Sequence, residues 1–136
     1  MYVSYIHEGL ADNKAPHTWH PKGRPRRNPS GLHIAARKLL KDMFPSVALL
    51  EEVSIQPTPF KTLYLDFYIP VLCYAIEVHG EQHYKFVQHY HTTAQQFVQS
   101  RKNDTLKKEW CIANHISFIE LPFNQQHVWR DIINGF

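Results

Sequence analysis

Residues 62–79 decide the fold of this protein, and they read TLYLDFYIPVLCYAIEVH. The first half alternates apolar and polar side chains, which is typical of a β-strand with one buried face. We expect one face of this strand to carry the apolar members of the alternation, Leu63, Leu65, Phe67 and Ile69. Pro70 interrupts the run, and a second strand is expected from Cys73 to His79.

An acidic residue lies inside each of these two strands. A hairpin whose turn is centred between Val71 and Leu72 would place Asp66 directly opposite Glu77, where Cβ atoms are about 4.5–5.5 Å apart. Carboxylates that close repel each other, and a divalent cation such as Mg²⁺ or Mn²⁺ removes the repulsion. An exposed acidic residue is the simpler interpretation, but Glu77 lies in an apolar run where an unpaired charge is costly. His79 follows two residues later and shares its face.

The rest of the chain supplies the elements around this hairpin. Ser30 is a good N-cap for a helix that Pro45 ends. Further elements are expected at residues 30–44 (helix), 51–55 (strand), 97–113 (helix), 116–121 (strand) and 128–133 (helix). The order helix, three strands, helix, strand, helix predicts an α/β fold with a mixed central β-sheet flanked by helices.

Positive charge is concentrated near the beginning of the chain. Between Lys14 and Lys41 there are eight Lys and Arg residues and no Asp or Glu, which is typical of a nucleic-acid-binding segment or of a solvated basic face. We expect residues 1–28 to form a flexible basic arm and residues 29–136 to form one domain. No apolar run approaches the roughly 20 residues of a membrane span, and no signal peptide opens the chain, so an intracellular location without a membrane partner is expected.

A longer motif surrounds the two acidic residues. It reads Leu65-Asp66-Phe67 and then Ile76-Glu77-Val78-His79-Gly80-Glu81-Gln82-His83-Tyr84. This motif resembles the PD-(D/E)XK nuclease superfamily, above all the branch that resembles very-short-patch-repair endonucleases and phage homing endonucleases of the EDxHD type. Residues 101–116 also resemble this branch, with an Arg-x-x-Asp-x-x-Lys helix that leads into a strand. The resemblance extends over residues 30–123 and implies a restriction-endonuclease-like core.

The resemblance also implies roles for individual residues. Asp66 and Glu77 would bind the metal, with the backbone carbonyl of Val78 as a further ligand. His79 stands where the superfamily usually has Lys and this branch often has Asp. His33 stands where relatives often carry Glu on the first helix, and a surface histidine is the alternative. The expected catalytic residues are Asp66, Glu77, His79, His33 and His83.

The activity implied by the resemblance is Mg²⁺- or Mn²⁺-dependent hydrolysis of DNA phosphodiester bonds. Cutting both strands would require a homodimer or two binding events, and the setting would be the cytoplasm, including that of a phage-infected bacterium. The alternatives are a nucleic-acid-binding module with weakened catalysis, which the absence of Lys at position 79 permits, and an RNA-directed nuclease. Asp104 and Lys107 either reach the site or form a surface pair. The residues expected to bind nucleic acid are Lys22, Arg24, Arg26, Arg27, Arg37 and Lys107.

Overall fold

The structure is a computed structural model of the 136-residue chain, and it describes residues 19–87, 91 and 93–135. Four strands form one sheet in the order β1-β2-β3-β4. The first two pairs are antiparallel and β3 is parallel to β4. The strands are β1 (Leu50–Thr58), β2 (Lys61–Ile69), β3 (Tyr74–His79) and β4 (Ser117–Pro122).

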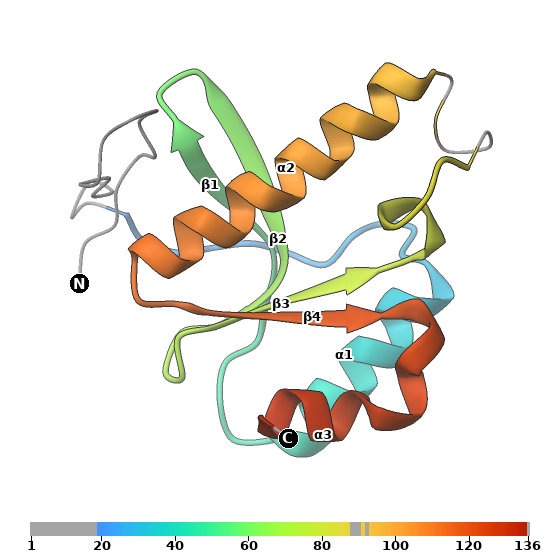
Figure 1. Ribbon diagram of the computed structural model, residues 1–136. Helices are drawn as coiled ribbons and strands as arrows, with labels where there is room; N and C mark the ends of the chain where they lie inside the picture. Colours follow the sequence, from blue (N-terminus) through green and yellow to red (C-terminus); the bar gives the residue numbers. More distant parts are fainter. Residues whose placement is uncertain (1–18, 88–90, 92, 136) are drawn as a thin grey trace.

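Helices lie on both faces of this sheet (Figure 1). α2 covers one face, and α1 and α3 cover the other. Two short 3₁₀ turns, η1 and η2, follow β3 and β4. The expected element order and the α/β fold with a mixed, helix-flanked sheet are therefore confirmed. The bounds are α1 (Gly31–Met43), η1 (Glu81–His83), α2 (Ala94–Ala113), η2 (Phe123–Val128) and α3 (Trp129–Asn134).

Side-chain caps determine where the two long helices begin. The Ser30 hydroxyl accepts a hydrogen bond from the His33 backbone N–H at 3.1 Å, as expected for the N-cap of α1. Thr93 caps α2 in the same way through the Gln96 N–H at 3.2 Å. This cap starts α2 three residues before the position that the sequence pattern predicted, because a capping hydroxyl determines a helix start more strongly than apolar spacing does.

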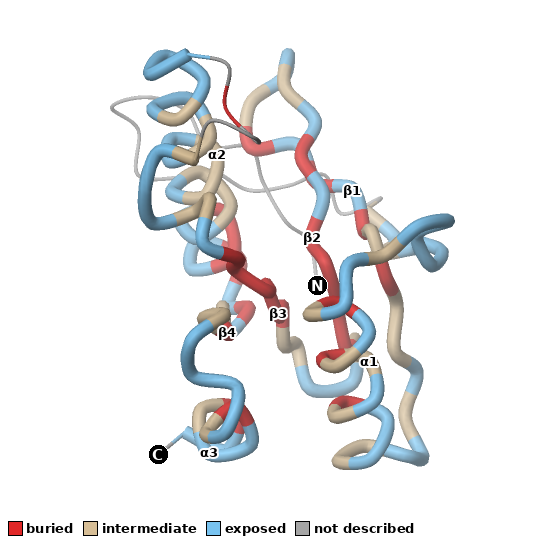
Figure 2. Tube along the Cα trace, turned by 90° about the vertical axis from the view of Figure 1, so that its right-hand side faces the viewer, coloured by how far each residue is buried: buried red, intermediate tan, exposed pale blue. Residues whose placement is uncertain are grey.

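Two hydrophobic cores hold the helices on the sheet. Trp110 and Cys111 of α2 pack on one face, and Ala36, Leu40 and Trp129 of α1 and α3 pack on the other. Buried residues are concentrated along β2 and β3, between the helices (Figure 2). The sheet is thus covered on both sides, and polar groups inside it are removed from bulk water.

The apolar side chains of β2 do not share one face, so that prediction was wrong. Leu63 and Leu65 contact the core beneath α2. Phe67 and Ile69 contact the core beneath α1 and α3. The change of face falls at Asp66, between Leu65 and Phe67.

The neighbouring strand β1 has an irregular backbone at Glu52, whose φ is 52°. A left-handed backbone is uncommon for a residue other than glycine and costs about 1–3 kcal/mol, so it persists only where the surrounding structure enforces it. Glu52 lies between two regular pairs of the β1–β2 hairpin, Glu51↔Phe67 and Val53↔Leu65. The irregular backbone therefore lies beside Asp66.

Residues 19–28, part of the expected arm, contain no helix or strand and pack against the domain. The Trp19 ring lies edge-on to Tyr68 and Trp110, with centroids 5.7 and 5.3 Å apart. A Cβ built on Gly23 would lie 1.9 Å from the Glu51 carbonyl oxygen, so only glycine fits this close approach. Residues 1–18 of the expected arm lie outside the described residues. No described helix is long and apolar enough to cross a bilayer.

Candidate metal and catalytic site

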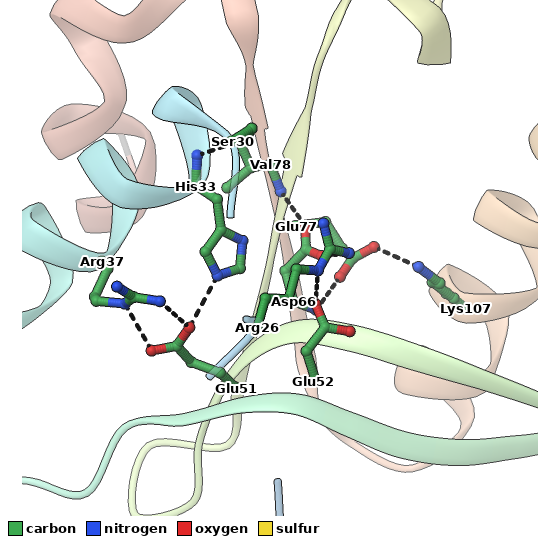
Figure 3. A network of polar contacts seen from close by, with 10 residues as sticks. All are labelled: Arg26, Ser30, His33, Arg37, Glu51, Glu52, Asp66, Glu77, Val78 and Lys107. Atoms are coloured by element: carbon green, nitrogen blue, oxygen red, sulfur yellow. Dashed lines mark hydrogen bonds and ion pairs between the residues drawn. The ribbon is translucent and has the colours of Figure 1, made fainter. Parts of the chain in front are cut away.

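Asp66 and Glu77 lie where β2 and β3 separate. The two strands pair from Ile69↔Tyr74 to Phe67↔Ile76, which is the register expected for a turn between Val71 and Leu72. Beyond the last pair, the Asp66 N–H donates to Glu77 Oε2 at 2.6 Å and the Val78 N–H donates to Asp66 Oδ2 at 2.9 Å. Each carboxylate therefore accepts a backbone N–H of the opposite strand at the point where the ladder ends (Figure 3).

Lys107 of α2 completes this arrangement. Its Nζ lies 2.8 Å from Glu77 Oε1, and the side chains are 15% and 1% exposed. Burial and the negative charge of Asp66 raise the pKa of Glu77 to about 7, against the opposing effect of Lys107. Burial alone would lower the pKa of Lys107, but the attraction of Glu77 outweighs it and raises the pKa. Lys107 is therefore held as a buried cation against a carboxylate.

His33 reaches the same region from α1 and is oriented by a buried acid. Its Nε2 lies 2.9 Å from Glu51 Oε1, and its ring stacks on Phe67 at 4.4 Å. Arg37 binds Glu51 with two hydrogen bonds of 2.8 and 2.9 Å. Burial alone would raise the pKa of Glu51, but hydrogen bonds from Arg37 and His33 outweigh it and lower the pKa. Because an ionised carboxylate only accepts, Nε2 carries the proton and Nδ1 presents a lone pair.

The first group of potential metal ligands consists of His33, Glu52 and Asp66. One nitrogen or carboxylate oxygen from each lies within 4.8 Å of the others. Arg26 occupies the same region, with an ion pair to Glu52 and its Nη2 3.5 Å from Asp66 Oδ1. Its guanidinium provides the positive charge that two neighbouring carboxylates require. Two oxygen ligands and one nitrogen ligand are therefore close enough that they could hold a cation.

The structure places the expected catalytic residues in two groups. His79 and His83 lie apart from the group around Asp66 and form a second one with Asp104 of α2. Asp104 and Lys107 both face the sheet side of α2, so the interpretation as an ordinary surface pair does not describe them. Val78 contacts the first group through its N–H, which binds Asp66.

The residues expected to bind nucleic acid also fall into two sets. Four of them line a hollow of about 860 Å³ between residues 22–27 and the β1–β2 hairpin, together with Glu52 and Tyr64. The other two have partners inside the protein, Arg37 with Glu51 and Lys107 with Glu77. The four residues of the hollow are Lys22, Arg24, Arg26 and Arg27.

Sequence reasoning did not find Glu51 and Glu52. Both lie at the start of β1, where a strand was expected without its register. Counting back from the hairpin turn, where Thr58 pairs with Lys61, would bring Glu52 opposite Phe67. An irregularity between Ile55 and Thr58 shifts the register by one residue and places Glu52 opposite Asp66 instead. The sequence pattern therefore held no signal that Glu52 would lie beside Asp66.

Two curated proteins of invertebrate iridescent viruses are similar to part of this chain. Uncharacterized protein 307L of Invertebrate iridescent virus 6 is 35% identical over 66 residues, which are 48% of this chain and 34% of that protein. Uncharacterized protein 033L of Invertebrate iridescent virus 3 is 28% identical over 67 residues, 49% of this chain and 34% of that protein. The chain therefore spans about a third of the length of these relatives. No protein-family model and no solved structure matches it.

Proposed function

We propose that this protein is a divalent-metal-dependent endonuclease that hydrolyses DNA phosphodiester bonds on a restriction-endonuclease-like core. The observation that carries the proposal is the buried group of Asp66, Glu77 and Lys107 where two central strands separate. Two carboxylates and an ammonium are costly to bury even when they are paired, and apolar side chains would serve stability as well. Such a cluster is therefore more typical of a functional site than of a structural one.

The group around Asp66 fits a catalytic metal ion. Glu52 and Asp66 supply the carboxylate oxygens that Mg²⁺ and Mn²⁺ prefer, and His33 supplies a nitrogen that suits Mn²⁺ better. Arg26 shows that this position already attracts positive charge. A bound ion of this kind would activate water and stabilise negative charge on a phosphate.

The protein's own side chains have separate tasks in this proposal. Glu51 holds the His33 ring so that Nδ1 is free to bind the ion or to take a proton from water. Lys107, held by Glu77, places an ammonium where it can donate a hydrogen bond to a phosphate oxygen. Asp66, Glu77 and Lys107 would correspond to the acid, acid and lysine of the resembled superfamily, with the lysine supplied by α2 instead of by position 79.

The hollow beside Glu52 supports a nucleic-acid substrate. Its wall carries the basic side chains of residues 22–27, next to the group around Asp66. Phosphate contacts from such residues would be independent of base sequence and would weaken as salt rises. The alternative of a non-catalytic binding module rested on the missing Lys at position 79, and the Lys107–Glu77 pair favours the enzyme over that alternative.

The test is cleavage of supercoiled plasmid and, separately, of labelled RNA with Mg²⁺ or Mn²⁺. We expect cleavage of plasmid by the full chain, no cleavage by Asp66→Asn, and a rate reduced about 10²–10³-fold by Lys107→Met. Glu109→Gln, at an exposed position of α2, is the matched control and should cleave normally. Nicked circles would indicate one-strand cutting, and linear product with a steep dependence on protein concentration would indicate a dimer.

Three outcomes would overturn this proposal. Salt-sensitive DNA binding without cleavage under either metal would favour the non-catalytic module. Cleavage of RNA but not plasmid would favour an RNA-directed nuclease. Plasmid cleavage that survives Asp66→Asn would show that the activity does not come from this site.

A further inference from the structure

A second group of potential metal ligands lies outside the site around Asp66. It consists of His79 at the end of β3, His83 of η1 and Asp104 of α2, and one ligand atom from each lies within 4.8 Å of the others. His83 Nδ1 is 2.8 Å from Asp104 Oδ2. The two imidazole rings are parallel within 1°, with centroids 4.2 Å apart. Three separate elements therefore each place a potential ligand atom within 4.8 Å of the other two.

His79 provides an independent sign that something binds here. The residue is 4% exposed, and its Nε2 is buried with no hydrogen-bond partner. Its Nδ1 faces Glu120 Oε1 of β4 at 3.4 Å, and Tyr84 donates a hydrogen bond to the other oxygen of Glu120. Because the carboxylate only accepts, the proton is on Nδ1 and Nε2 presents an unused lone pair. Leaving such a buried acceptor unpaired is costly.

We propose that His79, His83 and Asp104 bind a Zn²⁺ ion, with Glu120 orienting His79. Two imidazole nitrogens and one carboxylate oxygen are ligands that Zn²⁺ prefers, whereas Mg²⁺ prefers oxygen. A carboxylate on the second nitrogen of a ligating histidine is the usual support for such a site. The group borders a cavity of about 260 Å³, which leaves room for water as a fourth ligand.

This site would be distinct from the proposed Mg²⁺ or Mn²⁺ site. It would tie η1 and the middle of α2 to the end of β3. Asp104 lies one turn before Lys107 on α2, so the ion would also hold the helix that presents Lys107 to Glu77. Zinc binding itself does not depend on nuclease activity, so the two proposals fail independently.

The test measures zinc in the full-length protein after purification without chelators, and then titrates Zn²⁺ into metal-stripped protein in the presence of excess Mg²⁺. We expect one Zn²⁺ per chain and a rise in Tm of about 5–10 °C when free zinc is 100-fold above Kd. Co²⁺ in place of Zn²⁺ should give the strong visible absorption of a four-coordinate nitrogen and oxygen site. His83→Gln and Asp104→Asn should lose stoichiometric binding, and Glu120→Gln should weaken it about 10–100-fold.

Controls separate this site from other ways of binding zinc. His127→Gln, an exposed histidine of η2, should bind zinc normally. Circular dichroism shows whether each stripped variant is folded, and titration of His79→Gln gives an independent ligand deletion. Zinc uptake that survives both His83→Gln and Asp104→Asn, or that is lost in His33→Gln instead, would overturn the proposal. A Tm that rises with inorganic phosphate but not with Zn²⁺ would also overturn it, and would assign the cavity to an anion through Arg101 and Lys108.

Discussion

Arg37→Met removes the cation that keeps Glu51 ionised, and with it the support of His33. Arg37 makes two hydrogen bonds to Glu51, whose side chain is only 4% exposed, whereas Arg37 is 23% exposed. Met preserves the apolar stem of the side chain, so the variant tests the charge and the hydrogen bonds. We expect a large loss of stability, because the substitution leaves a buried carboxylate with one remaining partner.

The size of this loss of stability depends on whether Glu51 stays charged or takes up a proton in the folded variant. Removing one partner of a buried ion pair typically costs about 3–5 kcal/mol. Protonation of Glu51 limits this cost, because a protonated carboxyl group carries no charge. Protonating Glu51 costs about 1.4 kcal/mol for each pH unit above its ordinary pKa of 4.5. The limit is therefore about 5 kcal/mol at pH 8 and about 2 kcal/mol at pH 6. The folded variant binds more protons than the folded wild type, so the difference between them grows as pH rises.

The assay is urea unfolding of the metal-free protein at pH 6 and pH 8, followed by circular dichroism. Lys38→Met, an exposed lysine next to Arg37 on α1, is the matched control and should change stability by less than about 0.5 kcal/mol. The double variant Arg37→Met/Glu51→Gln removes both partners and should be more stable at pH 8 than Arg37→Met, because no charge is left buried.

Two results would refute this reasoning. A loss below about 1 kcal/mol at both pH values would mean that Arg37 does not hold Glu51 in solution. A loss that is large but equal at pH 6 and pH 8, with a double variant no better than the single one, would point to lost packing of the arginine stem instead of a stranded charge.

Three further predictions concern the neighbourhood of the site. Arg26→Ala should strengthen Mn²⁺ binding measured by calorimetry, because the guanidinium no longer competes at Asp66; unchanged affinity would contradict the assignment. Gly23→Ala should cost about 1–3 kcal/mol in urea unfolding and expose residues 19–28 to protease, since its Cβ would meet a β1 carbonyl at 1.9 Å. Gly31→Ala, with nothing within 4 Å of the new methyl group, is its control and should not reduce stability. Ser30→Ala should cost about 1 kcal/mol through loss of the α1 cap, and Ser30→Asp should retain most of the stability.

Local patterns were sufficient for the hairpin and for the order of elements. Alternation in residues 62–69 and Pro70 after it predicted two strands, and counting from the turn correctly placed Asp66 beside Glu77. These features depend on residues close together in the chain, where the period of the side chains and the chemistry of proline act directly. The α/β architecture followed from the same reasoning.

Tertiary structure decided which groups meet around those carboxylates. Lys107 is thirty positions after Glu77, and only the packing of α2 on the sheet brings its ammonium to that carboxylate. Glu52 lies beside Asp66 because the register of β1 against β2 shifts by one residue near the hairpin turn, which alternation does not reveal. His79 shares a strand face with Glu77, yet contacts from η1, α2 and β4 draw it into a different group. The sequence by itself determined the strands and their acidic residues, whereas long-range packing determined their partners, because twist, kinks and helix placement depend on contacts that no local period encodes.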